Sequence, residues 1–257
     1  MKPLFAGLAL ALTVLATPSS FADTAKPTIV LVHGAFADAS SWNGVIQRLE
    51  KDGYPVIAAA NPLRGVQADG AYVSSVVASV NAPVVLVGHS YGGSVISEAA
   101  NARPNVKALV YVSAFAPDAG ETAADLAGKF PGGTLGDALA PPAALPDGSK
   151  ELSIDQAKFP AQFAADVPPA QAALMAATQR PITVAALNEP AGEPAWKHLP
   201  SWFVYGDQDK NIPPQALQFM AKRAHAQAVT TIKGGSHVVM VSHPDAVARV
   251  IEQAAGH

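Results

Sequence analysis

Short apolar runs alternate with segments of helical periodicity along most of the chain, and this alternation restricts the fold more than any other feature. The runs TIVLV at Thr28–Val32 and VVLV at Val84–Val87 lack the polar alternation of a half-exposed strand. Continuous β-branched runs are typical of parallel strands that are buried on both faces. We predict strands at Thr28–Val32, Pro55–Ala59, Val84–Val87, Ala108–Val112, Trp202–Tyr205 and Val229–Ile232, and helices at Trp42–Lys51, Gly70–Val80, Ser94–Ala102, Pro214–Ala224 and Pro244–Ala255. Because such strands connect through right-handed crossovers, the expected fold is α/β, with a mostly parallel sheet and helices on both faces.

One long segment, Ala116–Leu199, interrupts this alternation. It holds half of the chain's 22 prolines and no convincing β run, and its alanine-rich stretches at Ala161–Ala165 and Ala170–Thr178 predict short helices. An insertion of this length between two sheet strands is usually functional, so we expect a helical cap over about 116–199. Its large apolar side chains could form a small core of the cap or line a substrate pocket; they are Phe130, Phe159, Phe163, Leu174, Met175 and Trp196.

The charge pattern gives no sign of a nucleic-acid partner. The 257 residues carry a formal net charge of −3, and no Lys/Arg cluster occurs that could displace counterions from phosphates. The chain has no cysteine, no His/Cys group at metal-ligand spacing and no suitably placed glycine-rich phosphate loop. We therefore expect no metal and no cofactor, and a single domain over residues 23–257.

The first 22 residues have the pattern of a secretory signal peptide. Lys2 precedes an apolar run over Leu4–Ala16, which is shorter than the roughly 20 residues that a membrane-spanning helix needs. Small residues at Ser20 and Ala22 fit a signal-peptidase site, so we expect cleavage before Asp23. The alternative is an ordinary N-terminal helix. Cleavage would give an exported protein, periplasmic or secreted, without a stable membrane anchor.

A G-x-S-x-G sequence, Gly88-His89-Ser90-Tyr91-Gly92, lies directly between the run at Val84–Val87 and a helical pattern. That setting is typical of a nucleophile elbow, a sharp strand-to-helix turn on which glycines leave room for the neighbouring segments. Ser90 is therefore the predicted nucleophile. The alternative is that Ser90 caps the N-terminus of the helix that follows.

A serine hydroxyl is a poor nucleophile until a base removes its proton, and His237 is the predicted base. It follows the last predicted strand in Gly234-Gly235-Ser236-His237, at the carboxyl edge of the sheet, where Ser90 also lies. His89 is expected to point away from the site into the packed interior.

The carboxylate that orients His237 should follow the strand at Trp202–Tyr205. Asp209 is preferred because it stands further out on that loop, whereas Asp207 is expected to bond backbone amides of the turn. Asp118, after the preceding strand, is the third candidate.

Two backbone amides are expected to stabilise an oxyanion. His33-Gly34-Ala35-Phe36 follows the first strand and can present an N–H opposite that of Tyr91, so Ala35 and Tyr91 form the predicted oxyanion hole. Phe36 is expected to contact the substrate, and His33 to hold the shape of the loop.

These motifs make the chain similar to the α/β-hydrolase superfamily over nearly all of its mature length. LVHGAFADASSW and VLVGHSYGG resemble the branch that contains plant methyl-ester esterases, hydroxynitrile lyases and many bacterial esterases. The resemblance implies an α/β-hydrolase sheet, a helical cap after the strand ending near Val112, and a triad order that Ser90, Asp209 and His237 match. YGDQDKNIPP is similar to the acid loop of this branch, with the second aspartate in the catalytic place. The hydroxynitrile lyases carry a lysine directly after the catalytic histidine; Val238 at this position argues against cyanide elimination.

The expected activity is therefore that of a carboxylesterase-like serine hydrolase. It would cleave a carboxylic ester or lactone of a small hydrophobic substrate through an acyl-enzyme, without a cofactor. One alternative is a sensor that binds a small molecule and signals through cap movement, although an export signal argues against it. Cofactor-free perhydrolysis or haloperoxidation is the other alternative, because the resemblance extends to enzymes that share the triad.

Overall fold

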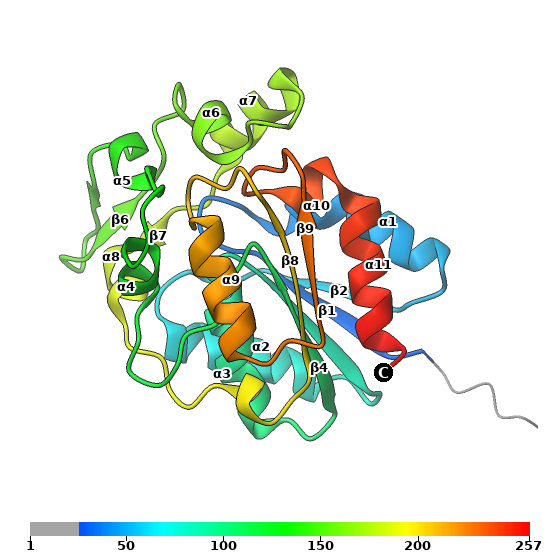
Figure 1. Ribbon diagram of the computed structural model, residues 1–257. Helices are drawn as coiled ribbons and strands as arrows, with labels where there is room; N and C mark the ends of the chain where they lie inside the picture. Colours follow the sequence, from blue (N-terminus) through cyan, green and yellow to red (C-terminus); the bar gives the residue numbers. More distant parts are fainter. Residues whose placement is uncertain (1–25) are drawn as a thin grey trace, which may run out of the picture.

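The protein is described by a computed structural model over residues 26–257, so the predicted signal peptide at 1–22 and its cleavage site lie outside the described residues. A parallel sheet of six strands forms its centre, in the order β2-β1-β3-β4-β8-β9 (Figure 1). All six predicted strands are present, and the α/β prediction is confirmed. Their bounds are β1 (Thr28–Val32), β2 (Val56–Ala59), β3 (Val84–His89), β4 (Val106–Val112), β8 (Ser201–Gly206) and β9 (Ala228–Ile232).

Helices cover both faces of this sheet (Figure 1). On one face α1 (Asn43–Lys51) packs against α11 (Pro244–Ala255), and on the other α2 (Val66–Ala78) packs against α3 (Gly92–Ala99), with α9 (Pro214–Arg223) beside β8. The short 3-10 helices η1 (Ala39–Trp42) and η2 (Ala100–Ala102) precede α1 and follow α3. Because the pairs bury apolar side chains against the sheet, the strands β1 and β3 have no exposed residue.

The predicted start of α2 at Gly70 is wrong, because the helix begins four residues earlier at Val66. Gly70 lies inside the helix, where an added Cβ would come within 2.7 Å of the Glu98 side chain on α3. The glycine therefore marks a close contact between two helices rather than a helix boundary.

The cap lies between β4 and β8, above the carboxyl ends of the strands (Figure 1). It contains the two expected helices, and it also contains an antiparallel sheet of three short strands that the sequence pattern does not predict. These strands have only two or three residues each, which is too short for a recognisable alternation of apolar and polar side chains. The cap elements are α4 (Ala123–Gly128), α5 (Leu135–Ala138), β5 (Ala143–Ala144), β6 (Lys150–Leu152), α6 (Phe159–Phe163), α7 (Pro169–Thr178), β7 (Ile182–Thr183), α8 (Val184–Asn188) and η3 (Ala195–Lys197).

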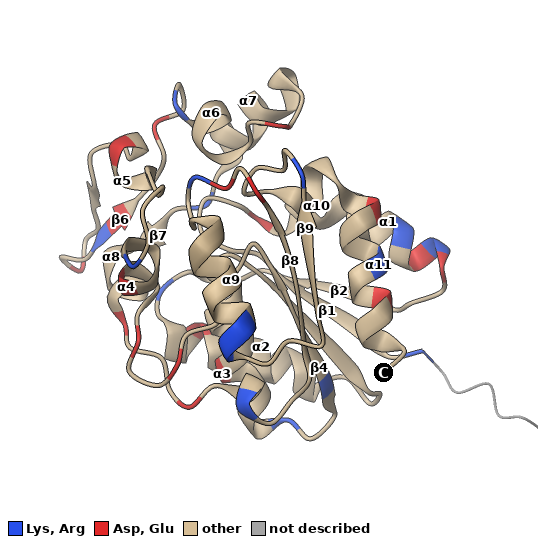
Figure 2. Cartoon of the chain, viewed as in Figure 1, with Lys and Arg blue, Asp and Glu red and all other residues tan. Residues whose placement is uncertain are grey.

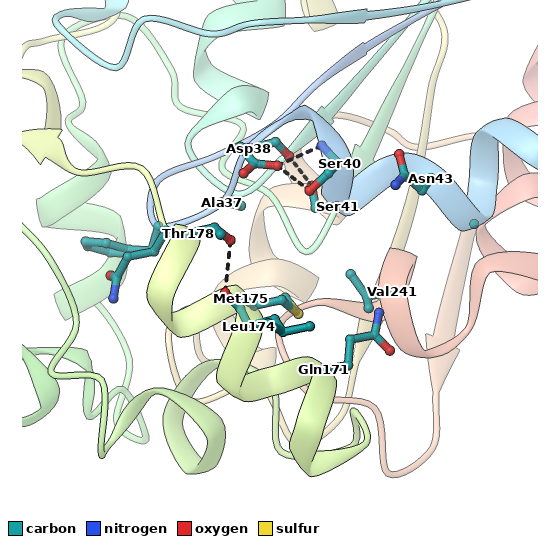
Figure 3. A pocket seen from close by; sticks show the side chains of 13 residues that line it. Ala37, Asp38, Ser40, Ser41, Asn43, Gln171, Leu174, Met175, Thr178 and Val241 are labelled. Carbon is teal, nitrogen blue, oxygen red and sulfur yellow. Dashed lines mark hydrogen bonds between the residues drawn. The ribbon is translucent and has the colours of Figure 1, made fainter.

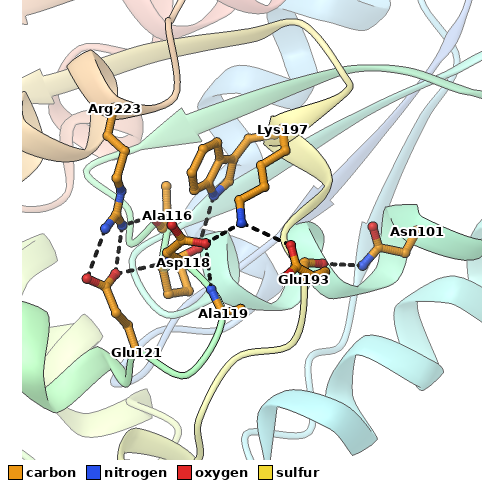
Figure 4. A network of polar contacts seen from close by, with 10 residues as sticks. Asn101, Ala116, Asp118, Ala119, Glu121, Glu193, Lys197 and Arg223 are labelled. Carbon is orange, nitrogen blue, oxygen red and sulfur yellow. Dashed lines mark hydrogen bonds and ion pairs between the residues drawn. The ribbon is translucent and has the colours of Figure 1, made fainter.

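The base of the cap is held by polar contacts between its two ends and α9 (Figure 4). The Arg223 guanidinium on α9 donates to both carboxylate oxygens of Glu121, at 2.9 and 2.7 Å, and to the Ala116 carbonyl at 2.8 Å. The Trp196 indole on η3 donates to the Pro117 carbonyl at 3.0 Å. Bidentate pairs of this kind fix geometry as well as adding stability, so the chain enters and leaves the cap at one anchored point.

Charged residues lie mainly on helices and loops, with both signs interspersed, whereas the central strands are almost free of them (Figure 2). Over residues 26–257, no helix has both the length and the apolar character needed to cross a membrane.

Candidate active site

Ser90 occupies the turn between β3 and α3 with a φ of +54°, in the left-handed region that residues other than glycine rarely adopt. An added Cβ at Gly92 would lie 2.5 Å from the Val32 carbonyl oxygen of the neighbouring strand, so the turn fits only because this position is glycine. The capping position of α3 is Tyr91, and no side chain caps the helix there. The capping interpretation of Ser90 is therefore not supported, and the turn has the geometry of a nucleophile elbow.

Asp209 and His237 contact each other from two different loops. Asp209 follows β8, His237 follows β9, and His237 Nδ1 lies 2.7 Å from Asp209 Oδ2. The second carboxylate oxygen, Oδ1, accepts the backbone N–H groups of Asn211 and Ile212 at 2.8 and 3.0 Å. Both side chains are buried. A carboxylate that accepts from Nδ1 keeps the proton on that nitrogen and leaves Nε2 as a hydrogen-bond acceptor.

The two alternative acids lie in other surroundings. Asp207 accepts the backbone N–H of Gly234 at 2.7 Å and so ties together the two loops that carry Asp209 and His237. Asp118 pairs with Lys197 at 2.6 Å at the base of the cap (Figure 4), and this contact lowers the pKa of its carboxyl. Neither carboxylate bonds to His237.

Ser90 and His237 both line one cavity of about 310 Å³ beneath the cap. The predicted residues Ala35, Phe36 and Tyr91 also line it. The rest of the wall is mostly apolar and comes largely from the cap; it consists of Phe115, Ala123, Ala124, Ala127, Leu135, Gly136, Leu139, Phe163, Leu187, Asn211 and Ile212. A mostly apolar cavity with a few convergent polar groups is the usual form of a small-molecule site.

The loop after β1 packs directly against the elbow. An added Cβ at Gly34 would lie 2.6 Å from Ser90 Cβ and 3.1 Å from the Tyr91 nitrogen. Within the described part of the chain, the amides of Ala35 and Tyr91 donate no hydrogen bond, whereas the amide of Phe36 donates to the Arg180 carbonyl at 3.0 Å. Two N–H groups beside Ser90 are thus available to an oxygen atom in the cavity.

Two further histidines are buried near the site. Burial lowers the pKa of His33, whose Nδ1 donates to the Gly34 carbonyl at 3.0 Å. The expectation that His89 points away from the site is wrong in part, because its ring lies 4.8 Å from the ring of His237. His89 Nε2 donates to the His237 carbonyl at 3.2 Å, and burial lowers the pKa of His89 well below its ordinary value. A neutral His89 therefore supports the loop that carries His237.

Sequence reasoning missed a buried carboxylate behind the elbow. Asp69 on α2 accepts the Tyr91 hydroxyl at 2.9 Å and the backbone N–H of Arg64 at 3.1 Å. Burial raises the pKa of Asp69, and burial together with the charge of Asp69 raises the pKa of Tyr91. No sequence motif marks this contact, because Asp69 and Tyr91 are distant in the sequence and meet only through the packing of α2 on the elbow.

Some of the large apolar side chains of the cap form its core, and others line a pocket. Phe163 lines the cavity at Ser90, Leu174 and Met175 line a second cleft, and Phe159 is fully buried in the cap. Over residues 26–257, no group of three or more His, Cys, Asp or Glu side chains is arranged to hold a metal ion.

Comparison with known proteins gives matches over nearly the whole described chain. Alpha/beta hydrolase nvfD of Aspergillus novofumigatus is 28% identical over 251 residues, covering 90% of this chain and 97% of its own. Alpha-hydroxynitrile lyase of Arabidopsis thaliana is 29% identical over 241 residues, with 85% and 93% covered. The crystal structure of polyneuridine aldehyde esterase superposes with a TM-score of 0.77 at 20% identity, over 89% of this chain and 98% of that one. A pyrethroid hydrolase from Sphingobium faniae gives a TM-score of 0.70 at 22% identity, over 90% and 97%.

The structural matches support the fold, and a match to a family model shows to which family the chain belongs. Residues 29–250, from β1 into α11, match the model of the alpha/beta hydrolase family. The chain therefore belongs to the alpha/beta hydrolase family.

Proposed function

We propose that this protein is a serine hydrolase in which Ser90, His237 and Asp209 act as a catalytic triad. The observation that carries the proposal is the 2.7 Å contact between His237 Nδ1 and Asp209 Oδ2, combined with a cavity wall that Ser90 and His237 share. Because Nδ1 is engaged by the carboxylate, the imidazole presents Nε2 to the cavity as a base.

The reaction would proceed through an acyl-enzyme. His237 Nε2 takes the hydroxyl proton as Ser90 Oγ attacks the ester carbonyl, and the carbonyl oxygen gains the negative charge. The amides of Ala35 and Tyr91 donate to that oxygen, a contribution worth about 3–4 kcal/mol for each donor. The protonated imidazole then gives its proton to the departing alcohol. Water repeats the sequence on the acyl-enzyme and releases the acid.

The lining of the cavity favours an uncharged, hydrophobic ester or lactone. No Lys, Arg, Asp or Glu side chain lies among its wall residues, and its polar side chains are Ser90, Tyr91, Asn211 and His237. The hydroxyl of Tyr91 is already engaged with Asp69. A charged substrate would lose hydration in this cavity without gaining a partner.

Cleavage of a cyanohydrin is the second candidate, since one relative is named as an alpha-hydroxynitrile lyase. Ester hydrolysis is favoured because the cavity wall offers no cation to a departing cyanide, and the residue after His237 is the fully buried Val238.

The test is the rate of hydrolysis of p-nitrophenyl esters from acetate to decanoate, measured beside cleavage of mandelonitrile. We expect ester hydrolysis, and a loss of about 10³-fold or more in kcat in Ser90→Ala. Ser79→Ala, the same change at an exposed position of the described chain, serves as the matched control. Full activity in Ser90→Ala would contradict the mechanism, and turnover of mandelonitrile alone would favour the lyase.

A further inference from the structure

A second cleft, of about 410 Å³, shares Phe36 with the cavity at Ser90. We call it the outer cleft. It runs between the loop that leads through η1 into α1 and the cap helix α7, with Val241 of α10 (Val239–Ser242) at one end (Figure 3). Its wall includes Phe36, Asp38, Asn43, Gln171 and Leu174.

Phe36 is the one residue that lines both the outer cleft and the cavity at Ser90, among the residues described for each. Its φ of +59° places it in the left-handed region, where an aromatic residue is strained. Two contacts hold it there: its amide donates to the carbonyl of Arg180, two residues after α7, and its ring centroid lies 6.2 Å from that of Phe163 in an edge-on arrangement. Phe36 is therefore held in place where the two spaces meet.

The outer cleft differs in chemistry from the cavity at Ser90. Leu174 contributes an apolar side chain that is 68% exposed. The side-chain amides of Asn43 and Gln171 make no hydrogen bond to any other residue within 26–257. Asp38 Oδ1 accepts the backbone N–H and the hydroxyl of Ser40. Such a wall suits an apolar chain that carries a neutral hydrogen-bonding group, such as an amide or a hydroxyl.

We propose that the outer cleft is a second subsite of the same active site, and that Phe36 is a specificity-determining residue between the two. This rests on the proposed serine-hydrolase function. The substrate would be an ester whose reacting carbonyl lies at Ser90 and whose distal part extends past the Phe36 ring. That distal part carries a neutral polar group, which bonds to the amides of Asn43 and Gln171 while its chain contacts Leu174.

The experiment uses three kinds of ester: p-nitrophenyl acetate, esters with a terminal acetamide on a six-carbon tail, and alkyl-tailed esters of equal length. The tail is placed on the acyl side in one series and on the alcohol side in the other. In Leu174→Trp the larger side chain obstructs the outer cleft, so kcat/KM for tailed esters should fall about tenfold relative to acetate in one of the two series. Ala173→Trp makes the same change at an exposed neighbour on α7 that does not line the cleft, and its ratio should stay within about twofold.

A second variant tests the polar group itself. Gln171→Leu should lower the ratio of amide-tailed to alkyl-tailed kcat/KM about threefold to tenfold, as expected for the loss of one hydrogen bond. The proposal is overturned if Leu174→Trp and Ala173→Trp give the same ratios in both series. If p-nitrophenyl acetate is still hydrolysed in that case, the proposed serine-hydrolase function remains supported and only the subsite proposal fails. If the native protein hydrolyses no ester at all, both proposals fail.

Discussion

Replacement of Asp209 by asparagine should almost abolish catalysis while leaving the fold intact. Asp209 Oδ1 accepts two backbone N–H groups, from Asn211 and Ile212 at 2.8 and 3.0 Å. The asparagine must therefore keep its carbonyl oxygen at that place, because its NH₂ group cannot accept. The NH₂ group then occupies the place of Oδ2 and faces His237 Nδ1, which is 2.7 Å away in the native chain.

Two donors cannot share one hydrogen bond, so the imidazole of the variant moves its proton to Nε2 and accepts through Nδ1. An Nε2 that carries a proton cannot take the proton of Ser90. A fixed wrong tautomer lowers kcat by about 10⁴-fold in a serine triad, which corresponds to about 5.5 kcal/mol of transition-state stabilisation.

The assay is kcat for p-nitrophenyl butanoate, with circular dichroism and thermal unfolding to show that the variant is folded. Asp207→Asn is the matched control, since it changes the same group on the same loop, where Asp207 Oδ1 accepts from the Gly234 amide and the Gln208 side chain. We expect the control to keep kcat within about tenfold. A folded Asp209→Asn protein with kcat near the native value, or two variants that are equally impaired, would refute the reasoning.

Two further predictions concern the surroundings of the site, and a third concerns the N-terminus. Tyr91→Phe removes the hydroxyl that donates to the buried Asp69, so the free energy of unfolding should fall by about 1–3 kcal/mol; a double-mutant cycle with Asp69→Asn in urea should show strong non-additivity, and additive effects would mean no coupling. His33 and His89 have pKa values below their ordinary 6.5 in the folded chain, so the unfolded chain binds more protons and stability should fall as the pH drops below about 6.5. In thermal unfolding, the stability of His89→Gln should depend less on pH than that of the native protein. An unchanged pH dependence would mean that His89 does not cause it. Export with cleavage before Asp23 predicts a mature N-terminus at that residue in Edman sequencing, and an intact Met1 on exported protein would contradict it.

The parts of the fold that sequence could predict are those fixed by local pattern. Most strands of the central sheet are apolar runs long enough to be recognised, and Ser90 lies in a motif whose glycines and flanking elements define one turn. The positions of Asp209 and His237 follow from chain order, since loops after parallel strands meet at one edge of the sheet.

The remaining features depend on contacts between segments that are distant in sequence. Asp69 reaches Tyr91 only because α2 packs on α3. The same packing requires glycine at position 70 inside α2, where the sequence pattern predicts a helix start. The ring of His89 meets His237 through the packing of β3 near the loop after β9. The cavity wall from the cap could not be assigned, because whether a cap side chain such as Phe163 faces its own core or the site depends on how the cap folds back.

The central claim, that Ser90 is an activated nucleophile, is tested most directly by labelling the purified protein with a fluorophosphonate and mapping the modified peptide by mass spectrometry. The account predicts one label, on Ser90, that is absent in Ser90→Ala and strongly slowed in Asp209→Asn. A folded protein that takes up no label, or a label on another residue that persists in Ser90→Ala, would contradict it.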